Sequence, residues 1–243
     1  MQLLAMFSHP HITHYTSSMS VASTCWSCGI PLDNSPLLCP NCGKVQLSAG
    51  IDYYQAFTLQ RSFAVDTAAL EREFHRLSRR LHPDRFARAT PQEQKWSLAA
   101  IALLNDAYRT LRDPIQRTEY LLKLEGFEIG EEFAGKNKTA ERRQPPADLL
   151  EEVFELNMQL EEMRVNQKMG EDDPALQADL TAARGKFESL LAEVDTGLAA
   201  SGNTWNSGDQ PIREKAAKDM AVLLDRRRYL RNLVRDVNQV LGA

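Results

Sequence analysis

The stretch LEREFHRLSRRLHPDRF, residues 70–86, contains both an amphipathic helix and the signal that ends it. Apolar residues recur at helical spacing along one face: Leu70, Phe74, Leu77 and Leu81. Basic residues lie off that face: Arg72, Arg76, Arg79 and Arg80. Pro83 ends the helix, because proline has no N–H to donate and disfavours the helical conformation in the residue before it. The tripeptide His82-Pro83-Asp84 is therefore expected in a loop directly after a basic helix.

The segments around this stretch also read as helices. Asp52 can cap a short helix through YYQAF, and Asp66 can cap the helix that ends at Pro83. Thr90-Pro91 is typical of the start of a further helix, with a broad apolar face, which stops at Asp113-Pro114. The short helix IQRTEYLLKL follows. We therefore expect an antiparallel helical hairpin with short flanking helices.

Several interpretations of His82-Pro83-Asp84 compete. A catalytic pair would need a pocket and a third group, and no neighbouring residue offers a nucleophile. A metal site would be two ligands short. A plain turn is chemically acceptable. The tripeptide, its place between two helices and the basic face beside it resemble the J domain, over residues 51–124.

This resemblance implies docking on a DnaK/HscA-type chaperone and stimulation of its ATPase. The trigger would be His82, Pro83 and Asp84, and the docking residues Arg72, Arg76, Arg79, Arg80 and Arg85. The chain itself would carry out no hydrolysis, so it is not expected to be an enzyme.

The cysteines form the pattern C-x2-C-x10-C-x2-C, made by Cys25, Cys28, Cys39 and Cys42. Two such pairs, each followed by glycine, can present thiolates to one tetrahedral ion, so residues 25–48 are predicted to form a zinc-ribbon-like module. Iron in a rubredoxin-like site is the minor alternative. Disulfides would need an export signal, and a thioredoxin-like pair would need a βαβ context; neither is present. Because thiolates fill the coordination shell, we expect one structural Zn²⁺.

Composition restricts the remaining function classes. Hydrophobic residues make up 43% of the 243 residues and charged residues 26%, as in soluble globular proteins, and the net charge is −4. A zinc ribbon that binds nucleic acid is expected to carry basic residues, but Cys25 to Cys42 contains no Lys or Arg. The sequence has no run of about 18 apolar residues, the length that a membrane-spanning helix would need. Residues 1–24 lack charged residues and are predicted to be a disordered tail, with a targeting peptide as the alternative.

The carboxy-terminal half is predicted to be a three-helix bundle. A polar, Gly- and Pro-containing linker is expected at 125–147, and helices near 148–169, 174–199 and 209–241 should form the bundle, residues 148–243. Asp148 is a candidate cap for the first helix. The expected core positions are Leu149, Val153, Leu156, Leu160 and Met163, then Leu176, Leu180, Phe187, Leu191, Val194 and Leu198, then Leu223, Leu230, Val234, Val237 and Leu241.

The first bundle helix has more apolar surface than a core needs. Leu150, Phe154 and Met158 step along a neighbouring face that is flanked by acids, and Tyr229 lies off the third seam, next to Leu233. An apolar stripe rimmed by acids is a candidate partner surface.

The order of cysteine module, J domain and helical bundle resembles the HscB/Jac-type co-chaperones of iron–sulfur cluster assembly. The resemblance is clearest in RTLRDPIQRTEYLLKLEGFE and LLEEVFELNMQL. It implies that the bundle binds an IscU-type scaffold through Leu150, Phe154, Glu155 and Tyr229, with Met158 on the same stripe. A general J protein for unfolded clients is the alternative. Bacterial cytoplasm and, as the alternative, mitochondrial matrix both suit this function, and whether the chain dimerises stays open.

Overall fold

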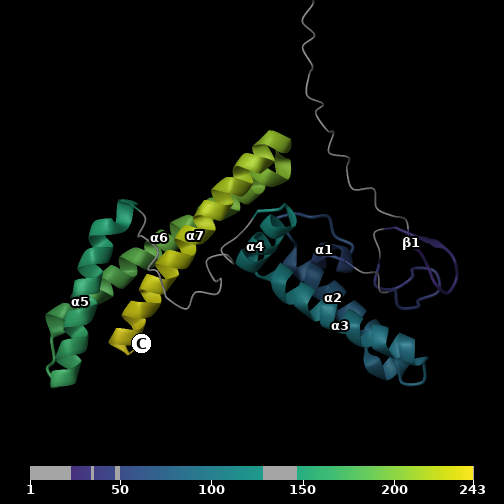
Figure 1. Ribbon diagram of the computed structural model, residues 1–243, viewed down its shortest axis with the longest axis horizontal. Coiled ribbons are helices and arrows are strands. Elements are labelled where there is room, and N and C mark those ends of the chain that lie inside the picture. The colour runs from purple at the N-terminus through teal and green to yellow at the C-terminus, as the bar shows by residue number, and fades with distance from the viewer. Residues whose placement is uncertain (1–22, 34–35, 47–49, 128–146, 243) are drawn as a thin grey trace, which may run out of the picture.

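The computed structural model describes residues 23–33, 36–46, 50–127 and 147–242, and these residues form a mainly helical protein (Figure 1). A small cysteine-containing module, a helical hairpin and a three-helix bundle follow one another along the chain, which confirms the predicted fold class. The predicted tail and linker lie almost entirely outside the described residues. No helix among the described residues is long and apolar enough to cross a membrane.

The cysteine module is built from two similar turns. Strand β1 (Ser23–Thr24) pairs antiparallel with β2 (Pro31–Leu32), and a single bridge joins Leu38 to Val45. In each turn a cysteine carbonyl accepts from the glycine four residues later, and both glycines have a left-handed backbone that favours a residue without a side chain. Because β1 precedes Cys25, the module begins before the predicted boundary.

The hairpin consists of α2 (Thr67–Leu81) and α3 (Pro91–Arg112), flanked by α1 (Tyr53–Ala56) and α4 (Pro114–Leu124). The predicted caps of the hairpin are present, since Asp52, Asp66 and Thr90 accept from backbone N–H groups in the first turn of their helices. Asp113, at which α3 ends, also caps α4 in this way. The helices therefore begin where the local sequence satisfies their free N–H groups.

Ring stacking and one buried hydrogen bond join α2 to α3. The rings of Phe74 and Tyr108 stack with their centroids 4.2 Å apart. The Ser97 hydroxyl on α3 donates to the carbonyl of Leu81, the last residue of α2, at 2.6 Å. The end of α2 is thus anchored just before the His82-Pro83-Asp84 loop.

The core of the hairpin continues into the cysteine module. Leu37, Leu38 and Val45 belong to the same cluster of buried residues as the hairpin, whereas Cys25, Leu32 and Cys39 form a small cluster of their own. The module therefore packs on the hairpin through apolar contacts and shares part of its core.

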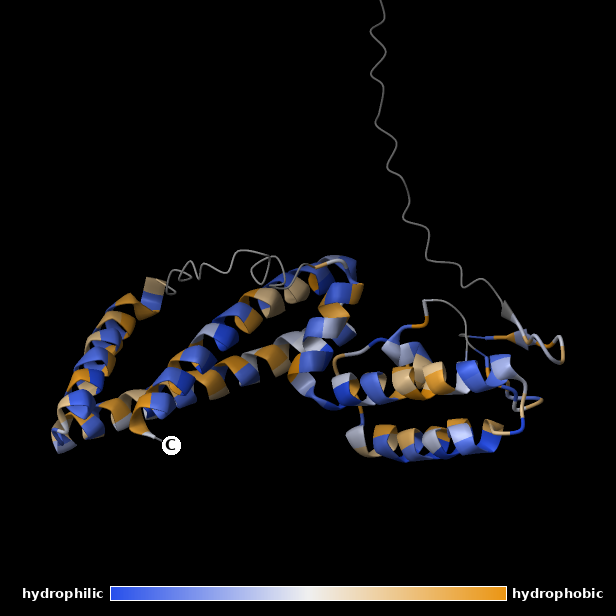
Figure 2. Cartoon of the chain, turned by 60° about the horizontal axis from the view of Figure 1, so that its bottom comes forward, coloured by the Kyte–Doolittle hydropathy of each residue, from blue (hydrophilic) through white to orange (hydrophobic). Residues whose placement is uncertain are grey.

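The bundle contains α5 (Leu150–Met169), α6 (Pro174–Ser207) and α7 (Gln210–Leu241), preceded by a 3-10 turn η2 (Ala147–Leu149). Figure 2 shows apolar and polar residues alternating along each of these helices, as amphipathic helices require. All the predicted core residues of α5 are buried, and so are those of α6 except Leu191, which is partly buried.

Two predictions for the bundle are wrong in detail. Asp148 does not cap α5; instead its carboxylate forms a bidentate pair with Arg226 of α7, at 2.7 and 2.9 Å. The buried face of α7 is also rotated from the predicted seam: Leu224, Leu233 and Val240 are buried, whereas Leu223, Val234 and Leu241 are only partly so. Packing against α6 and α4 selects this face.

Helix α6 is longer than predicted, because its last two turns pack on the hairpin. The stretch after Leu198 contains Gly, Ser and Asn and reads as a loop, yet the helix continues to Ser207. The Phe63 ring, which precedes α2, lies edge-on to Trp205 at a centroid distance of 5.1 Å. The Asn206 side-chain oxygen accepts from the Phe63 N–H and from the Ser62 hydroxyl, both at 3.1 Å.

This close approach depends on Gly202. A Cβ added there would lie 3.0 Å from the Cβ of Phe63. We expect Gly202→Val to force the two apart and to cost about 1–3 kcal/mol of folding free energy. Differential scanning calorimetry should show a lowered melting temperature.

Gly185→Val on the same helix is the matched control. No described atom outside the helix backbone would meet an added Cβ at Gly185 within 4 Å, so this variant should melt almost as the wild type does. If the two variants melt alike, Phe63 does not limit the space at Gly202.

Candidate functional site

The four cysteine sulfurs converge on one point. All four Sγ atoms lie within 4.8 Å of one another, with Cys25 and Cys42 3.6 Å apart and Cys28 and Cys39 3.7 Å apart. Zinc–sulfur bonds of about 2.3 Å in a tetrahedron place sulfur atoms about 3.8 Å apart. The donor set therefore fits a tetrahedral metal ion, as the spacing predicts.

Hydrogen bonds to the sulfurs favour the thiolate form that a metal requires. The N–H groups of Ser27 and Cys28 point at Cys25 Sγ, at 3.4 and 3.5 Å, and Cys42 N–H donates to Cys39 Sγ at 3.5 Å. Burial raises the pKa of the Cys25 thiol, but the N–H groups of Cys28 and Ser27 and the neighbouring thiols of Cys28 and Cys42 outweigh it and bring the pKa to about 6. The N–H of Lys44 lowers the pKa of Cys42, but burial and the neighbouring sulfurs outweigh it and raise that pKa to about 11. Four thiolates leave no position for water, so the site is suited to structure rather than catalysis.

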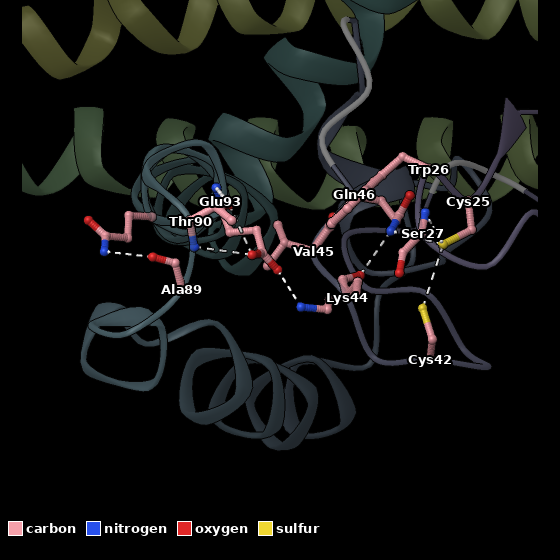
Figure 3. A network of polar contacts seen from close by, with 11 residues as sticks. Cys25, Trp26, Ser27, Cys42, Lys44, Val45, Gln46, Ala89, Thr90 and Glu93 are labelled. Carbon is pink, nitrogen blue, oxygen red and sulfur yellow. Dashed lines mark hydrogen bonds and ion pairs between the residues drawn. The ribbon is translucent and has the colours of Figure 1, made fainter.

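Gln46 supports the site, and the spacing of the cysteines does not reveal it. Its side-chain amide is buried and donates to Cys25 Sγ at 3.4 Å and to the Lys44 carbonyl at 3.0 Å (Figure 3). A glutamine four residues after the last cysteine carries no pattern of its own in one sequence. Its burial beside sulfur is what identifies it as a group that orients a metal ligand.

The His82-Pro83-Asp84 loop is exposed at the end of the hairpin farthest from the bundle (Figure 1). His82 ends α2, and residues Pro83–Phe86 form one 3-10 turn. Within this turn His82 Nδ1 accepts from the Asp84 N–H at 3.3 Å, and the side chain of Asp84 is 89% exposed. The histidine thus fixes the turn, and the carboxylate is free to meet another molecule.

The predicted basic stripe lies on the surface of α2 beside this loop. Its members are all exposed: Arg72, Arg76, Arg79, Arg80 and Arg85. Arg76 donates to Glu73 one turn earlier, at 2.7 Å, so part of its charge is already neutralised. Among the described residues the other four form no ion pair, so their charges remain available to a partner.

On the bundle, α5 carries an apolar stripe that faces solvent. Phe154 is 69% exposed, Met158 60% and Leu150 52%, whereas the core residues between them are buried. The stripe is longer than the sequence suggested, because Val165 and Met169 are also exposed toward the other end of α5. Glu155, the predicted acidic contact, is exposed as well. Exposed apolar surface of this extent on one helix is typical of a protein-binding face.

Tyr229 is only half-buried and packs partly against the core. It lies one turn after Arg226, which pairs with Asp148 just before α5. The same side of α7 therefore adjoins the start of the α5 stripe. Unlike the exposed Phe154, Tyr229 packs partly against the core, and Leu233, one turn later on α7, is buried.

Comparison with known proteins places these features in one family. The chain is 33% identical over 148 residues to the co-chaperone protein HscB homolog of Shewanella halifaxensis, covering 61% of this chain and 76% of that protein. It is 35% identical over 173 residues to the iron–sulfur cluster co-chaperone protein HscB of Homo sapiens, covering 69% of this chain and 63% of the human one. No protein-family model matches the chain.

The solved structures agree. The crystal structure of human co-chaperone protein HscB matches with a TM-score of 0.62 at 26% identity, covering 89% of this chain and 98% of the other. Chaperone HscB from Vibrio cholerae matches with a TM-score of 0.55 at 26% identity, covering 78% and 97%. With a J-domain hairpin, a helical bundle and a cysteine cluster suited to a metal, the chain belongs to the HscB family of iron–sulfur cluster co-chaperones.

Proposed function

We propose that this chain stimulates the ATPase of a DnaK/HscA-type chaperone through residues 51–124 and delivers an IscU-type scaffold protein to it through residues 148–243. The observation that carries the proposal is the separation of two exposed surfaces. The His82-Pro83-Asp84 loop and the α5 stripe lie on different limbs of the molecule (Figure 1). One molecule can therefore hold both partners at once, and it activates the ATPase without being an enzyme itself.

The chemistry of the hairpin suits an acidic chaperone surface. Arg72, Arg79, Arg80 and Arg85 are exposed beside the loop, and arginine is well suited to interface ion pairs. The 3-10 turn holds Asp84 in a defined position at the tip. Basic docking on α2 would thus place the loop against the chaperone in one orientation.

We expect the triple variant His82→Ala/Pro83→Ala/Asp84→Ala to abolish ATPase stimulation. The loop is exposed, so the change should alter folding free energy by no more than about 0.5 kcal/mol. Scaffold binding should persist because its contacts lie in the bundle. Single-turnover ATP hydrolysis by the partner chaperone measures the effect.

Glu171→Ala/Asp172→Ala provides the control, since it changes an exposed loop of the bundle instead. It should stimulate hydrolysis as the wild type does. Normal stimulation by the triple variant would contradict the assignment of the loop as the trigger.

The α5 stripe suits a folded partner. Its apolar side chains are flanked by Glu151 and Glu155, which give the surface a charge pattern that a general binder of denatured chains does not need. We therefore place the scaffold contact on Leu150, Phe154, Glu155 and Met158, with Tyr229 at its edge. The general J protein for unfolded clients remains the competing function, and it would bind any denatured chain equally well.

Phe154→Ala should weaken scaffold binding by about 2 kcal/mol, which is about thirtyfold in affinity, because an exposed aromatic contributes contact area to the partner. The melting temperature should hardly change. Titration calorimetry with the scaffold and thermal melting measure the two quantities.

Phe187→Ala is the matched control, since this ring is 1% exposed in the core. It should cost about 3–5 kcal/mol of stability and leave the affinity of the folded protein unchanged. Scaffold binding that survives Phe154→Ala, or equal binding of denatured chains, would argue against a dedicated scaffold site.

For the cysteine module, residues 25–48, we propose one structural zinc ion. Four thiolates with N–H donors around them form a closed site of the kind that zinc occupies, with iron as the alternative. Nucleic acid is not among the proposed partners, because Cys25 to Cys42 contains no Lys or Arg. We propose bacterial cytoplasm as the compartment, with the mitochondrial matrix as the alternative that localisation of the tagged chain would reveal.

Elemental analysis of the purified protein should show about one zinc per chain. Cys25→Ser/Cys28→Ser should lose the metal and leave the helicity of the bundle unchanged. It should also lower the melting temperature of the hairpin, because Leu37, Leu38 and Val45 share its core. A metal-free wild type, or one that holds iron, would contradict the zinc assignment.

A further inference from the structure

The cysteine module contacts both helix ends that flank the His82-Pro83-Asp84 loop. On the α3 side, the ammonium of Lys44 lies 2.6 Å from the Glu93 carboxylate in the first turn of the helix (Figure 3). On the α2 side, the guanidinium of Arg80 in the last turn lies near Gly43, since a Cβ added to this glycine would be 3.8 Å from it. The module therefore lies beside both helix ends that flank the loop and pairs directly with the one on α3.

Glu93 is the central group of this contact. Its side chain is 5% exposed, and it completes a capping box by accepting from the Thr90 N–H at 3.3 Å and from the Thr90 hydroxyl at 3.0 Å. The Lys44 ammonium, and after it the Thr90 groups, hold the pKa of Glu93 below its usual value. Thr90 is the last residue before α3, so the carboxylate that Lys44 pairs with also fixes where the loop ends.

A second contact runs through aromatic rings. The side-chain N–H of Trp26 donates to the Val45 carbonyl at 2.8 Å. The centroid of the Trp26 ring lies 5.5 Å from that of Trp96, which comes one turn after Glu93 on α3. The Lys44 ammonium also lies 5.9 Å from the centre of the Trp26 ring. The first two turns of α3 are thus held by an ion pair and by ring packing together.

Both contact residues depend on the metal site for their position. Trp26 follows Cys25 directly, and Lys44 comes two residues after Cys42. The backbone turns that carry them are the ones whose N–H groups point at the sulfurs. When the metal is absent, the two turns are tied to each other only by weaker contacts. Among the described residues these are small apolar clusters, the Trp26 N–H on the Val45 carbonyl, and the side-chain amides of Asn41 and Gln46 on the sulfurs of Cys28 and Cys25.

We propose that the metal-loaded module is a positioning element for the chaperone-activating loop, with Lys44 acting through Glu93 and Trp26 acting through Trp96. The inference rests on the proposed function for its activity readout. It gives the module a role in the reaction: loss of the metal weakens chaperone stimulation although the trigger residues are unchanged. The metal and thiol state of the module thereby sets the output of the J domain.

Lys44→Met tests this role, because it removes the ammonium and keeps the length of the side chain. We expect it to retain zinc, to speed amide hydrogen exchange several-fold over residues 83–96, and to leave exchange in α5–α7 unchanged. The co-chaperone concentration for half-maximal ATPase stimulation should rise several-fold, while the maximal rate falls less. Lys44→Arg should restore both readouts, since it replaces the charge. Wild type stripped of zinc by a chelator under reducing conditions should behave as Lys44→Met does or more strongly.

Lys186→Met is the control, since it breaks a comparable pair, 3.0 Å from Glu152, in the bundle. It should leave exchange over 83–96 and stimulation unchanged. Wild-type exchange in Lys44→Met, or faster exchange with normal stimulation, overturns the proposal. Loss of zinc in Lys44→Met would overturn it too, by assigning Lys44 to the metal site. If wild type itself fails to stimulate, the proposed function fails, whereas the exchange data still decide whether the module braces the loop.

Discussion

The antiparallel packing of α2 on α3, on either side of an exposed turn, is the constraint on which the rest of the structure depends. Proline cannot continue α2, so the chain leaves the helix at His82 and returns through a single 3-10 turn into α3. The hydroxyl of Ser97 holds the last carbonyl of α2 against α3, which keeps the two helix ends together below the turn. The result is a hairpin with an exposed tip. The cysteine module joins it near the tip, and the bundle joins it at the far end.

The two attachments differ in chemistry, and the difference suits a co-chaperone that serves two partners. At the tip, the cysteine module joins the hairpin around the buried carboxylate of Glu93 and the ring of Trp96. At the far end, α6 approaches Phe63 so closely that a Cβ at position 202 would lie 3.0 Å from the Cβ of Phe63, and Arg228 of α7 pairs with Glu119 of α4 at 3.3 Å. The loop and the α5 stripe are thereby kept apart, so under the proposed function neither partner need displace the other.

The cysteine module shows how a metal site can act at a distance from its ligands. Cys25, Leu32 and Cys39 form a small cluster of their own, but Leu37, Leu38 and Val45 are part of the hairpin core. A module of this size has little core of its own, so a bound metal would supply the rigidity that the proposed role needs. That rigidity reaches α3 because the residues beside the ligands, rather than the ligands themselves, make the contacts.

The sequence by itself determined the features that depend on neighbours in the chain. Cysteine spacing predicts the sulfur cluster, Asp113-Pro114 and Thr90-Pro91 mark helix boundaries through local hydrogen bonds, and the apolar repeat of α5 predicts its buried face. Only the tertiary structure decided what depends on distant residues. The Gly-, Ser- and Asn-containing end of α6 stays helical because Trp205 and Asn206 find Phe63 and its neighbour there. The carboxylate of Asp148 pairs with Arg226 of α7 and does not cap α5. Lys44 and Gln46 gain their roles from a buried carboxylate and a buried sulfur, partners that no local pattern encodes.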